Sequence, residues 1–285
     1  MYVLAAVGLL LVRCGEGEGQ KEESHSEIAL PTISKVWETP QSLRVPESVF
    51  YDSIDDVIYV ANINGHPLDK DNNGFISRLS TSGDILDLKW VEGLHAPKGM
   101  GIFDGRLYVS DIDQVVKIDI DAARILNRYE AEGAEFLNDI AIDKSGVVYI
   151  SDMSKNRIYR LKDNQVDIWL ELDQKGPNGL YVENDRLLIG TSESIIAANL
   201  ADGVVRTFVE NTCSIDGLVP DGKGNYIISD WTGRTYLVRP GAKHVVLLDT
   251  GPSGMNAADI EFVIPKRLLL IPTFFDNRVV AYELR

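Results

Sequence analysis

The chain is poor in cysteine, and this shortage limits both its stabilisation and its chemistry. It has two cysteines in 285 residues, Cys14 and Cys213. Only Cys213 falls within the part expected to fold, so that part needs no internal disulfide. No histidine stands at a nucleophile-like spacing from Cys213, and we expect a buried structural thiol there. The sequence also has no G-x-S-x-G motif, and its four histidines form no spaced pair.

Positive charge is also scarce. Lysine and arginine number 28 against 43 aspartates and glutamates, which gives a formal charge of −15. Nucleic-acid binding requires Lys and Arg to neutralise phosphates, so we expect no nucleic-acid partner. Attraction to anionic lipid is disfavoured for the same reason. The excess acid is compatible with cation binding, but we expect it mainly to give a well-solvated surface.

Only one sustained apolar run occurs, at residues 2–12. It is too short for a helix that spans a bilayer, but it suits the core of a signal peptide. We expect residues 1–14 to be an export signal, 15–31 a polar acidic tether with nothing to bury, and 32–285 the folded domain.

Cys14 directly follows the apolar run and is a candidate lipidation site. Lipidation would make the protein a periplasmic or cell-envelope lipoprotein, attached to the membrane only through its lipid. Two features depart from the usual lipoprotein pattern. No Lys or Arg precedes the run, and Arg13 stands where a small residue is usual.

One position recurs along the folded part where a loop enters a strand, at spacings of 51, 40, 40, 38 and 43 residues. We call it the ring position. It carries Glu47, Lys98, Asn138, Asn178, Asp216 and Asp259. A period of about 40–50 residues is typical of a propeller blade of four strands. Short β-branched and aromatic runs follow in each repeat, such as V-I-Y-V-A-N at 57–62 and R-L-Y-V-S-D at 106–111.

The last repeat ends after its third strand, and the segment I-S-K-V-W-E at 33–38 precedes the first repeat. This segment can supply the missing outer strand, and closure of the ring removes exposed sheet edges. An open solenoid would need capping repeats, which the sequence lacks. We therefore predict an all-β fold, a six-bladed β-propeller closed by an N-terminal strand. The ring positions would then converge at one end of a central channel.

Glu47, Asn178 and Asp216 would bring two carboxylates and an amide oxygen to this channel. Hard oxygen ligands without His or Cys favour Ca²⁺, Mg²⁺ or Mn²⁺ over tight structural zinc. Carboxylates packed together without a cation would raise one another's pKa. Alternatively, Asp or Asn at a strand start simply bonds to nearby backbone. We predict one divalent ion, with Ca²⁺ favoured over Mg²⁺, Mn²⁺ or Zn²⁺.

Glu47, the Asn138-Asp139 pair, the P-N-G around Asn178 and the D-G around Asp216 resemble the gluconolactonase and senescence-marker-protein (regucalcin) family, in register over residues 46–285. The resemblance implies a six-bladed propeller with a divalent metal held by Glu47, Asn178 and Asp216. It implies hydrolysis of a lactone or related small ester by metal-activated water, with Asp216, or its neighbour in the channel Asp139, as general base. It also places Asn138 against the metal-bound water or the substrate.

The sequence departs from that family at three places. Phe136 and Ile140 stand where many lactonases have Arg and Gly, which makes the pocket less suited to a polyhydroxylated sugar acid. Lys98 can pair with Glu47, anchor a substrate carboxylate or face solvent, and a lysine beside a metal weakens cation binding unless a carboxylate neutralises it.

The loop at 62–74 is the longest expected on the ring face, and it would bring His66 over the pocket. Its D-K-D-N-N-G stretch at 69–74 matches half of an EF-hand loop, but Ser80 stands where the bidentate Glu belongs, so we expect a turn. The candidate substrate-binding residues are Lys98, Phe136, Asn138 and His66.

A rival hypothesis is a non-catalytic propeller that binds a ligand or a protein and holds a structural ion in its ring. Fold alone does not determine function, so both readings stay open. Lys98, Phe136 and Ile140 favour the binding propeller. If the protein is an enzyme, we expect its substrate to be a small molecule.

Overall fold

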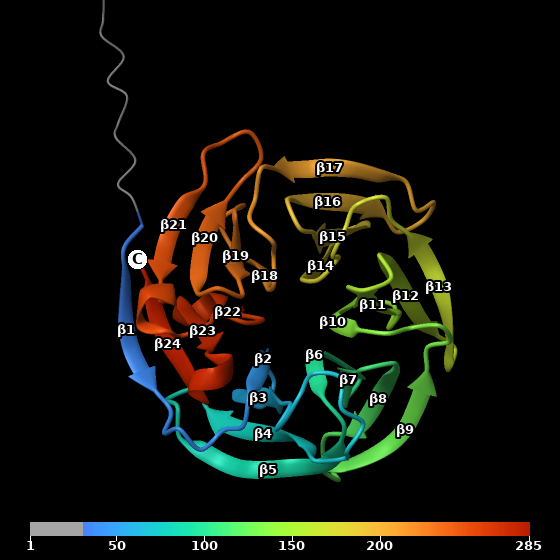
Figure 1. The fold of residues 1–285 in the computed structure, drawn as a ribbon, viewed down its shortest axis with the longest axis horizontal. Helices are drawn as coiled ribbons and strands as arrows, with labels where there is room; N and C mark the ends of the chain where they lie inside the picture. The colour runs from blue at the N-terminus through green and yellow to red at the C-terminus, as the bar shows by residue number, and fades with distance from the viewer. Residues whose placement is uncertain (1–30) are drawn as a thin grey trace, which may run out of the picture. The chain divides into compact units, whose positions relative to one another are not determined.

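The computed structural model describes residues 31–285. The predicted signal at 1–14, Cys14 and all but the last residue of the predicted tether lie outside the described residues. Residues 31–285 form six antiparallel four-stranded sheets arranged as a ring around a central axis (Figure 1). The predicted all-β six-bladed propeller is confirmed. No helix within residues 31–285 is long and apolar enough to cross a membrane.

Each blade runs from an innermost strand at the axis to an outermost strand at the rim. Blade 1 contains β2 (Pro46–Asp52), β3 (Val57–Asn62), β4 (Gly74–Ser80) and β5 (Ile85–Leu94). Blade 2 contains β6 (Pro97–Phe103), β7 (Arg106–Asp111), β8 (Gln114–Asp119) and β9 (Arg124–Glu130). Blade 3 contains β10 (Leu137–Ile142), β11 (Val148–Asp152), β12 (Arg157–Lys162) and β13 (Gln165–Glu171).

The remaining blades repeat this order. Blade 4 contains β14 (Leu180–Glu183), β15 (Arg186–Gly190), β16 (Ser194–Asn199) and β17 (Val205–Glu210). Blade 5 contains β18 (Leu218–Pro220), β19 (Tyr226–Asp230), β20 (Arg234–Val238) and β21 (Val245–Asp249). Blade 6 contains β22 (Glu261–Val263), β23 (Leu268–Pro272), β24 (Val279–Leu284) and the N-terminal β1 (Ile33–Glu38).

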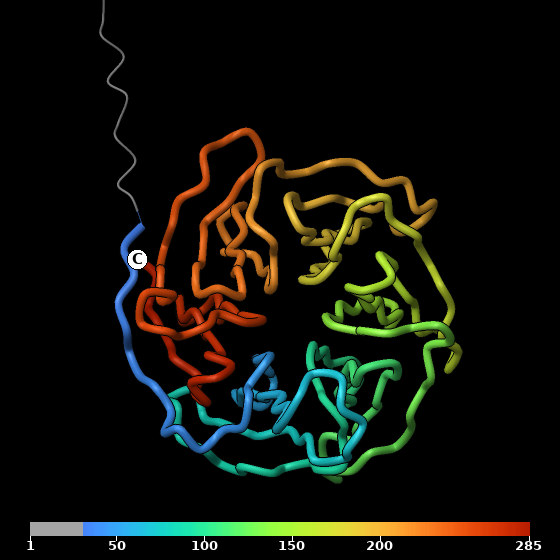
Figure 2. Tube along the Cα trace, in the orientation of Figure 1, coloured from blue at the N-terminus to red at the C-terminus, as the bar shows by residue number. Residues whose placement is uncertain are grey.

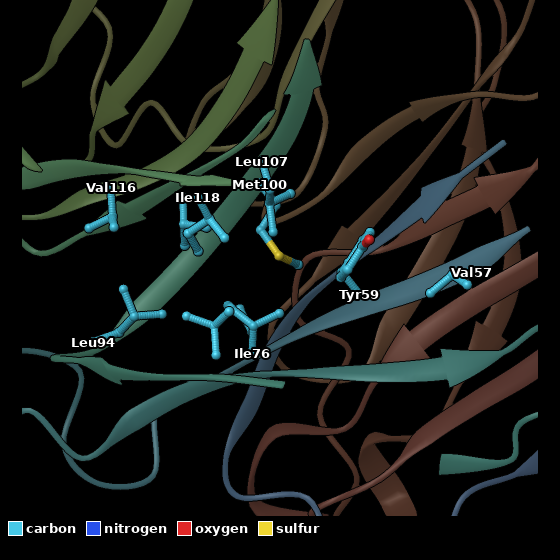
Figure 3. Close-up of a cluster of buried hydrophobic side chains, with 11 residues drawn as sticks. Val57, Tyr59, Ile76, Leu94, Met100, Leu107, Val116 and Ile118 are labelled. Carbon is cyan, nitrogen blue, oxygen red and sulfur yellow. The ribbon is translucent and has the colours of Figure 1, made fainter. Parts of the chain in front are cut away.

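The apolar runs of the second strands form the core between neighbouring blades. Figure 3 shows one such cluster, in which Tyr59 and Ile76 of blade 1 face Met100 and Leu107 of blade 2. Burial of such side chains contributes about 1.5–3 kcal/mol each. Because every blade packs against two others, this core runs around the whole ring and holds the innermost strands in place.

The ring closes where the N-terminal strand joins the last blade, as predicted. β1 pairs antiparallel with β24, and Ile33 lies opposite Leu284; Figure 2 shows the two segments side by side at the rim. The Trp37 indole donates a hydrogen bond to Thr81 O at 3.0 Å and so ties β1 to blade 1. Gly83 allows this contact, because its φ is +89° and a Cβ there would lie 2.6 Å from the Trp37 ring.

Candidate functional site

Five ring positions meet in one cavity at one end of the channel, with a volume of about 680 Å³. The side chains are Glu47, Lys98, Asn138, Asn178 and Asp216. Each is at most 6 % exposed, so these polar groups have little access to bulk water. The predicted convergence is therefore present for five of the six repeats.

Polar residues at the ends of the second strands hold the loops that lead into the ring. Asp111 accepts a hydrogen bond from Ala96 N at 2.7 Å, and Asp152 accepts one from Phe136 N at 3.3 Å. Both donors stand two residues before a ring position. These bonds fix the backbone of the loops that carry Lys98 and Asn138. Asp111 and Asp152 therefore stabilise the loops and do not line the cavity.

Serines near the ends of two second strands connect blade 2 to blade 3 and blade 5 to blade 6. The Ser110 hydroxyl donates to Asn138 O, and the Ser229 hydroxyl donates to Ala258 O at 2.7 Å. These serines were not predicted from the sequence, although S-D recurs at 110–111, 151–152 and 229–230; Ser151 instead accepts a hydrogen bond from Asp139 N within blade 3. Ser110 and Ser229 fix the relative height of neighbouring innermost strands.

The sixth ring position was predicted one residue too late. Ser229 contacts Ala258 just as Ser110 contacts Asn138, so Ala258 and not Asp259 occupies the ring position. Successive residues of an extended chain point to opposite sides, and this shift sends Asp259 elsewhere. It lines a second cavity of about 360 Å³ and accepts a hydrogen bond from Ser48 Oγ at 2.7 Å.

Asp139 also lines this second cavity rather than the one that holds the ring side chains. It directly follows a ring position, so the same alternation turns it away from Asn138. Its carboxylate accepts backbone hydrogen bonds from Leu180 at 2.5 Å and Ile140 at 2.6 Å. The structure therefore brings together Glu47, Asn138, Asn178 and Asp216, but not Asp139.

Asn178 and Asp216, which both line the cavity, form a direct pair. Asn178 Nδ2 donates to Asp216 Oδ1 at 2.9 Å. Gly179 permits the close approach of their strands, since a Cβ at this position would lie 2.6 Å from Asp216 O. The P-N-G motif thus has a physical basis: the Asn enters the cavity and the Gly lets the neighbouring blade come near.

Three buried oxygens of the cavity have no hydrogen-bond partner among the described residues. They are Glu47 Oε2, Asn138 Oδ1 and Asn178 Oδ1. An unpartnered buried polar atom costs about 1–3 kcal/mol, so such a cluster indicates a missing donor or cation. Across residues 31–285 no three His, Cys, Asp or Glu side chains gather as a metal-binding group. The cavity instead combines two carboxylates with amide oxygens, a set that suits a hard cation.

The two carboxyl groups are difficult to ionise together. Burial raises the pKa of Glu47 well above its ordinary value, and the nearby Asp216 carboxylate raises it further, whereas Lys98 opposes the shift. Burial likewise raises the pKa of Asp216 to about 7, against the hydrogen bond from Asn178. A divalent cation would favour both ionised forms. The residues present therefore fit a divalent ion.

Lys98 is fully buried and lines the cavity, so it does not face solvent. Its ammonium donates to Ala96 O at 2.8 Å and to Pro67 O at 3.0 Å. It also lies 4.9 Å from the Phe136 ring centroid, a cation–π arrangement. Burial lowers the pKa of Lys98 to about 8, although the Glu47 carboxylate favours its charged form. Within residues 31–285 its direct partners are carbonyls and an aromatic ring, not Glu47.

The long loop between β3 and β4 covers part of the cavity, as predicted. His66 and Pro67 line it, and the bond from Lys98 to Pro67 holds the loop down. The 69–74 stretch, which matches half of an EF-hand loop, forms a turn in which Asp71 accepts a hydrogen bond from Asn73 N at 3.2 Å. Phe136 lines the cavity too. All four candidate substrate-binding residues thus border one space.

No family profile and no curated protein matches the chain. Solved structures do resemble it. A streptogramin B lyase superposes with a TM-score of 0.66 at 10% identity, over 90% of this chain and 98% of that one. A candidate gluconolactonase gives 0.66 at 15% identity, over 90% and 93%. A nidogen/laminin complex gives 0.60 at 17% identity, over 71% and 80%. At these identities the likenesses show the propeller fold alone.

Proposed function

We propose that the chain is a hydrolase of a lactone or a related small ester and that it depends on a divalent cation, with Ca²⁺ preferred. The observation that carries the proposal is the cluster of unpartnered buried oxygens on Glu47, Asn138 and Asn178. The fold shared with a candidate gluconolactonase supports it, and so does the residue pattern that resembles that family. A streptogramin B lyase shares the same fold.

Glu47, Asn178 and Asp216 would hold the cation. When bound, such an ion polarises an ester carbonyl and lowers the pKa of water. With the cation bound, the Asp216 carboxyl would be ionised, so it could take a proton from an attacking water. Because Asp139 faces the second cavity, we assign the general base to Asp216 alone. Asn138 would contact the substrate or the attacking water.

Lys98 supports a second candidate function, a binding propeller without turnover. Its buried ammonium shares the cavity with Glu47 and offsets one carboxylate charge. With the second carboxyl protonated, the cavity carries no net charge and needs no ion to balance it. Its contents would then be a bound ligand rather than a reacting ester.

A panel of lactones and aryl esters with added Ca²⁺, Mg²⁺, Mn²⁺ or Zn²⁺ separates these functions. We expect turnover that chelation abolishes and a divalent ion restores. Asp216→Asn should lower it by about 10²-fold or more, a typical effect for a lost acid–base group, and Glu47→Gln should lower it by removing a ligand of the ion. Turnover that is absent with every ion, or unchanged in both variants, would refute the hydrolase.

We further propose that the protein is exported and that Cys14 is its lipid attachment site. This rests on the order of an apolar run, a cysteine and an acidic tether. Mass spectrometry of the N-terminal peptide tests it. A diacylglycerol-modified Cys14 is expected, and an intact N-terminus in the cytosol would contradict export.

A further inference from the structure

We infer that the ligand is amphipathic: a lactone or ester that carries an alkyl or aryl group of several carbons, rather than a sugar lactone. The inference rests on the proposed function and specifies its substrate class. Its basis is the division of the cavity into a polar floor and an apolar wall.

Aromatic side chains from two blades form one side of the wall. Trp231 follows β19, and Phe274 and Phe275 follow β23. The three rings meet edge to face, with centroids 5.6 Å apart for Trp231 and Phe274, 5.9 Å for Trp231 and Phe275, and 4.8 Å for the phenylalanine pair.

Exposure within this trio distinguishes packing from ligand contact. Phe274 is 5 % exposed and packs against Ile63 and Ala96 in a buried cluster, which is a structural role. Trp231 is 43 % exposed and Phe275 is 63 % exposed, although both line the cavity. Large aromatic side chains exposed at a cavity mouth leave apolar surface in contact with water, and a bound ligand would bury that surface.

Apolar groups continue around the other sides. Ile63, Phe136, Met153 and Ile215 also line the cavity, from blades 1 and 3 and from the loop into blade 5. The polar side chains at the ring positions are at most 6 % exposed, so they form the floor of the cavity. The more exposed aromatic side chains, Trp231 and Phe275, form its mouth. A bound ester would therefore place its carbonyl at the floor and its apolar group against the rings.

A sugar lactone would fit this wall poorly. Outside the ring positions, the lining side chains able to hydrogen-bond a hydroxyl are His66, Ser214 and the Trp231 indole. A sugar lactone brings several hydroxyls, and each one buried without a partner costs about 1–3 kcal/mol. The cavity also has room for more than a bare ring: at roughly 30 Å³ per water-sized group, its volume holds on the order of twenty non-hydrogen atoms.

Steady-state hydrolysis of δ-valerolactone, δ-decalactone and glucono-δ-lactone tests the inference. A buried methylene adds about 0.8 kcal/mol, or roughly fourfold, so kcat/KM for δ-decalactone should exceed that for δ-valerolactone by 10²-fold or more. Glucono-δ-lactone should be the poorest of the three. A preference for glucono-δ-lactone, with turnover intact, would overturn the inference and leave the hydrolase standing.

Substitutions in the mouth connect the preference to the wall. Phe275→Ala and Trp231→Ala should each lower kcat/KM for δ-decalactone about tenfold and change that for δ-valerolactone less than twofold. Ile54→Ala is the matched control, because Ile54 is 87 % exposed and lies outside the cavity. Equal losses on both lactones, or none on either, would overturn the role of the wall.

A binding measurement keeps the two failures apart. Calorimetry with a non-hydrolysable δ-lactam, with and without a pentyl substituent, reports ligand class without turnover. Tighter binding of the pentyl lactam that Phe275→Ala removes, in a protein that hydrolyses no lactone, would refute the hydrolase and support the amphipathic ligand. Equal binding of both lactams would overturn the inference.

Discussion

Asn178 donates a hydrogen bond from Nδ2 to Asp216 Oδ1 at 2.9 Å, across the boundary between blades 4 and 5. An ionised carboxylate only accepts hydrogen bonds, so this contact turns the amide nitrogen toward Asp216 and directs Asn178 Oδ1 away from it. That oxygen has no partner among residues 31–285. The pair therefore presents a carboxylate and an oriented amide oxygen to the same cavity, which is the arrangement a hard cation needs.

Removal of the buried lysine charge should tighten cation binding. Lys98→Met removes a positive charge near the proposed ion, and we expect the Kd for Ca²⁺ at pH 7 to fall on the order of tenfold. The substitution also raises the pKa of Glu47 further, because in the native chain the charge of Lys98 lowers that pKa. The ion carries two charges against the single proton it displaces, so the net effect favours the ion.

Lys70→Met is the control for this comparison. Lys70 is exposed and pairs with Asp113 on the same face, so its loss should leave the Kd for Ca²⁺ within about twofold. Calorimetric titration measures both variants. Weaker binding in Lys98→Met than in the native chain would indicate that the ammonium supports the site rather than opposing the ion.

Closure of the ring by β1 should contribute strongly to stability. A chain that starts at residue 39 lacks β1 and leaves the edge of β24 unpaired. It also loses the packing of Trp37 and Ile33, at about 1.5–3 kcal/mol for each large apolar side chain. We expect the free energy of unfolding in urea to fall by more than about 3 kcal/mol.

The open edge should also promote association, because an unpaired strand pairs with other chains. Light scattering after size exclusion measures this. A chain that starts at residue 31 retains β1 and is the control. If the shorter chain were as stable and as monomeric as the control, the closure would be of little energetic importance.

Stability should decline as pH rises from about 4.5 to 7, because of the carboxyls around the second cavity. Burial raises the pKa of Glu261 from its ordinary 4.5 to about 7, against hydrogen bonds from Tyr51 N and Phe262 N. The folded state therefore holds a proton that the unfolded state releases in this window, and folding weakens as pH rises through it.

Glu261→Gln tests this sign. It retains an oxygen for Phe262 N and cannot ionise, so we expect it to be more stable than the native chain at pH 8 by about 1–2 kcal/mol, a value reduced because Glu261 is partly exposed. The gain should vanish near pH 4.5. Glu283→Gln is the control, since Arg285 lowers the pKa of that carboxyl. A gain that is equal at both pH values would show that the effect is not ionisation.

The propeller could be predicted because its signals are local and repeated. The predicted strands at 57–62, 106–111 and 33–38 coincide with β3, β7 and β1, where apolar runs end at Asn, Asp or Glu. Convergence of the ring positions then followed from topology. Five of the six repeats have a polar side chain that enters the cavity.

The rest depended on register and on side-chain direction, which the sequence does not encode locally. Ala258-Asp259 and Asn138-Asp139 both place an aspartate second in the pair. Only the serine hydrogen bonds to Ala258 O and Asn138 O show which residue of each pair occupies the ring position. A shift of one residue reverses the side on which a side chain lies. The position of Lys98 was equally open, since its carbonyl partner Pro67 lies in another blade.

The most direct test is calorimetric Ca²⁺ titration of the native chain beside Asp216→Asn and Asp259→Asn. Both positions hold a buried aspartate at the channel, but only Asp216 lines the cavity with the unpartnered oxygens. We expect one ion per native chain, affinity lowered at least tenfold by Asp216→Asn, and little change with Asp259→Asn. Failure of the native chain to bind Ca²⁺, Mg²⁺ or Mn²⁺, or equal losses in the two variants, would contradict a cation site at Glu47, Asn178 and Asp216.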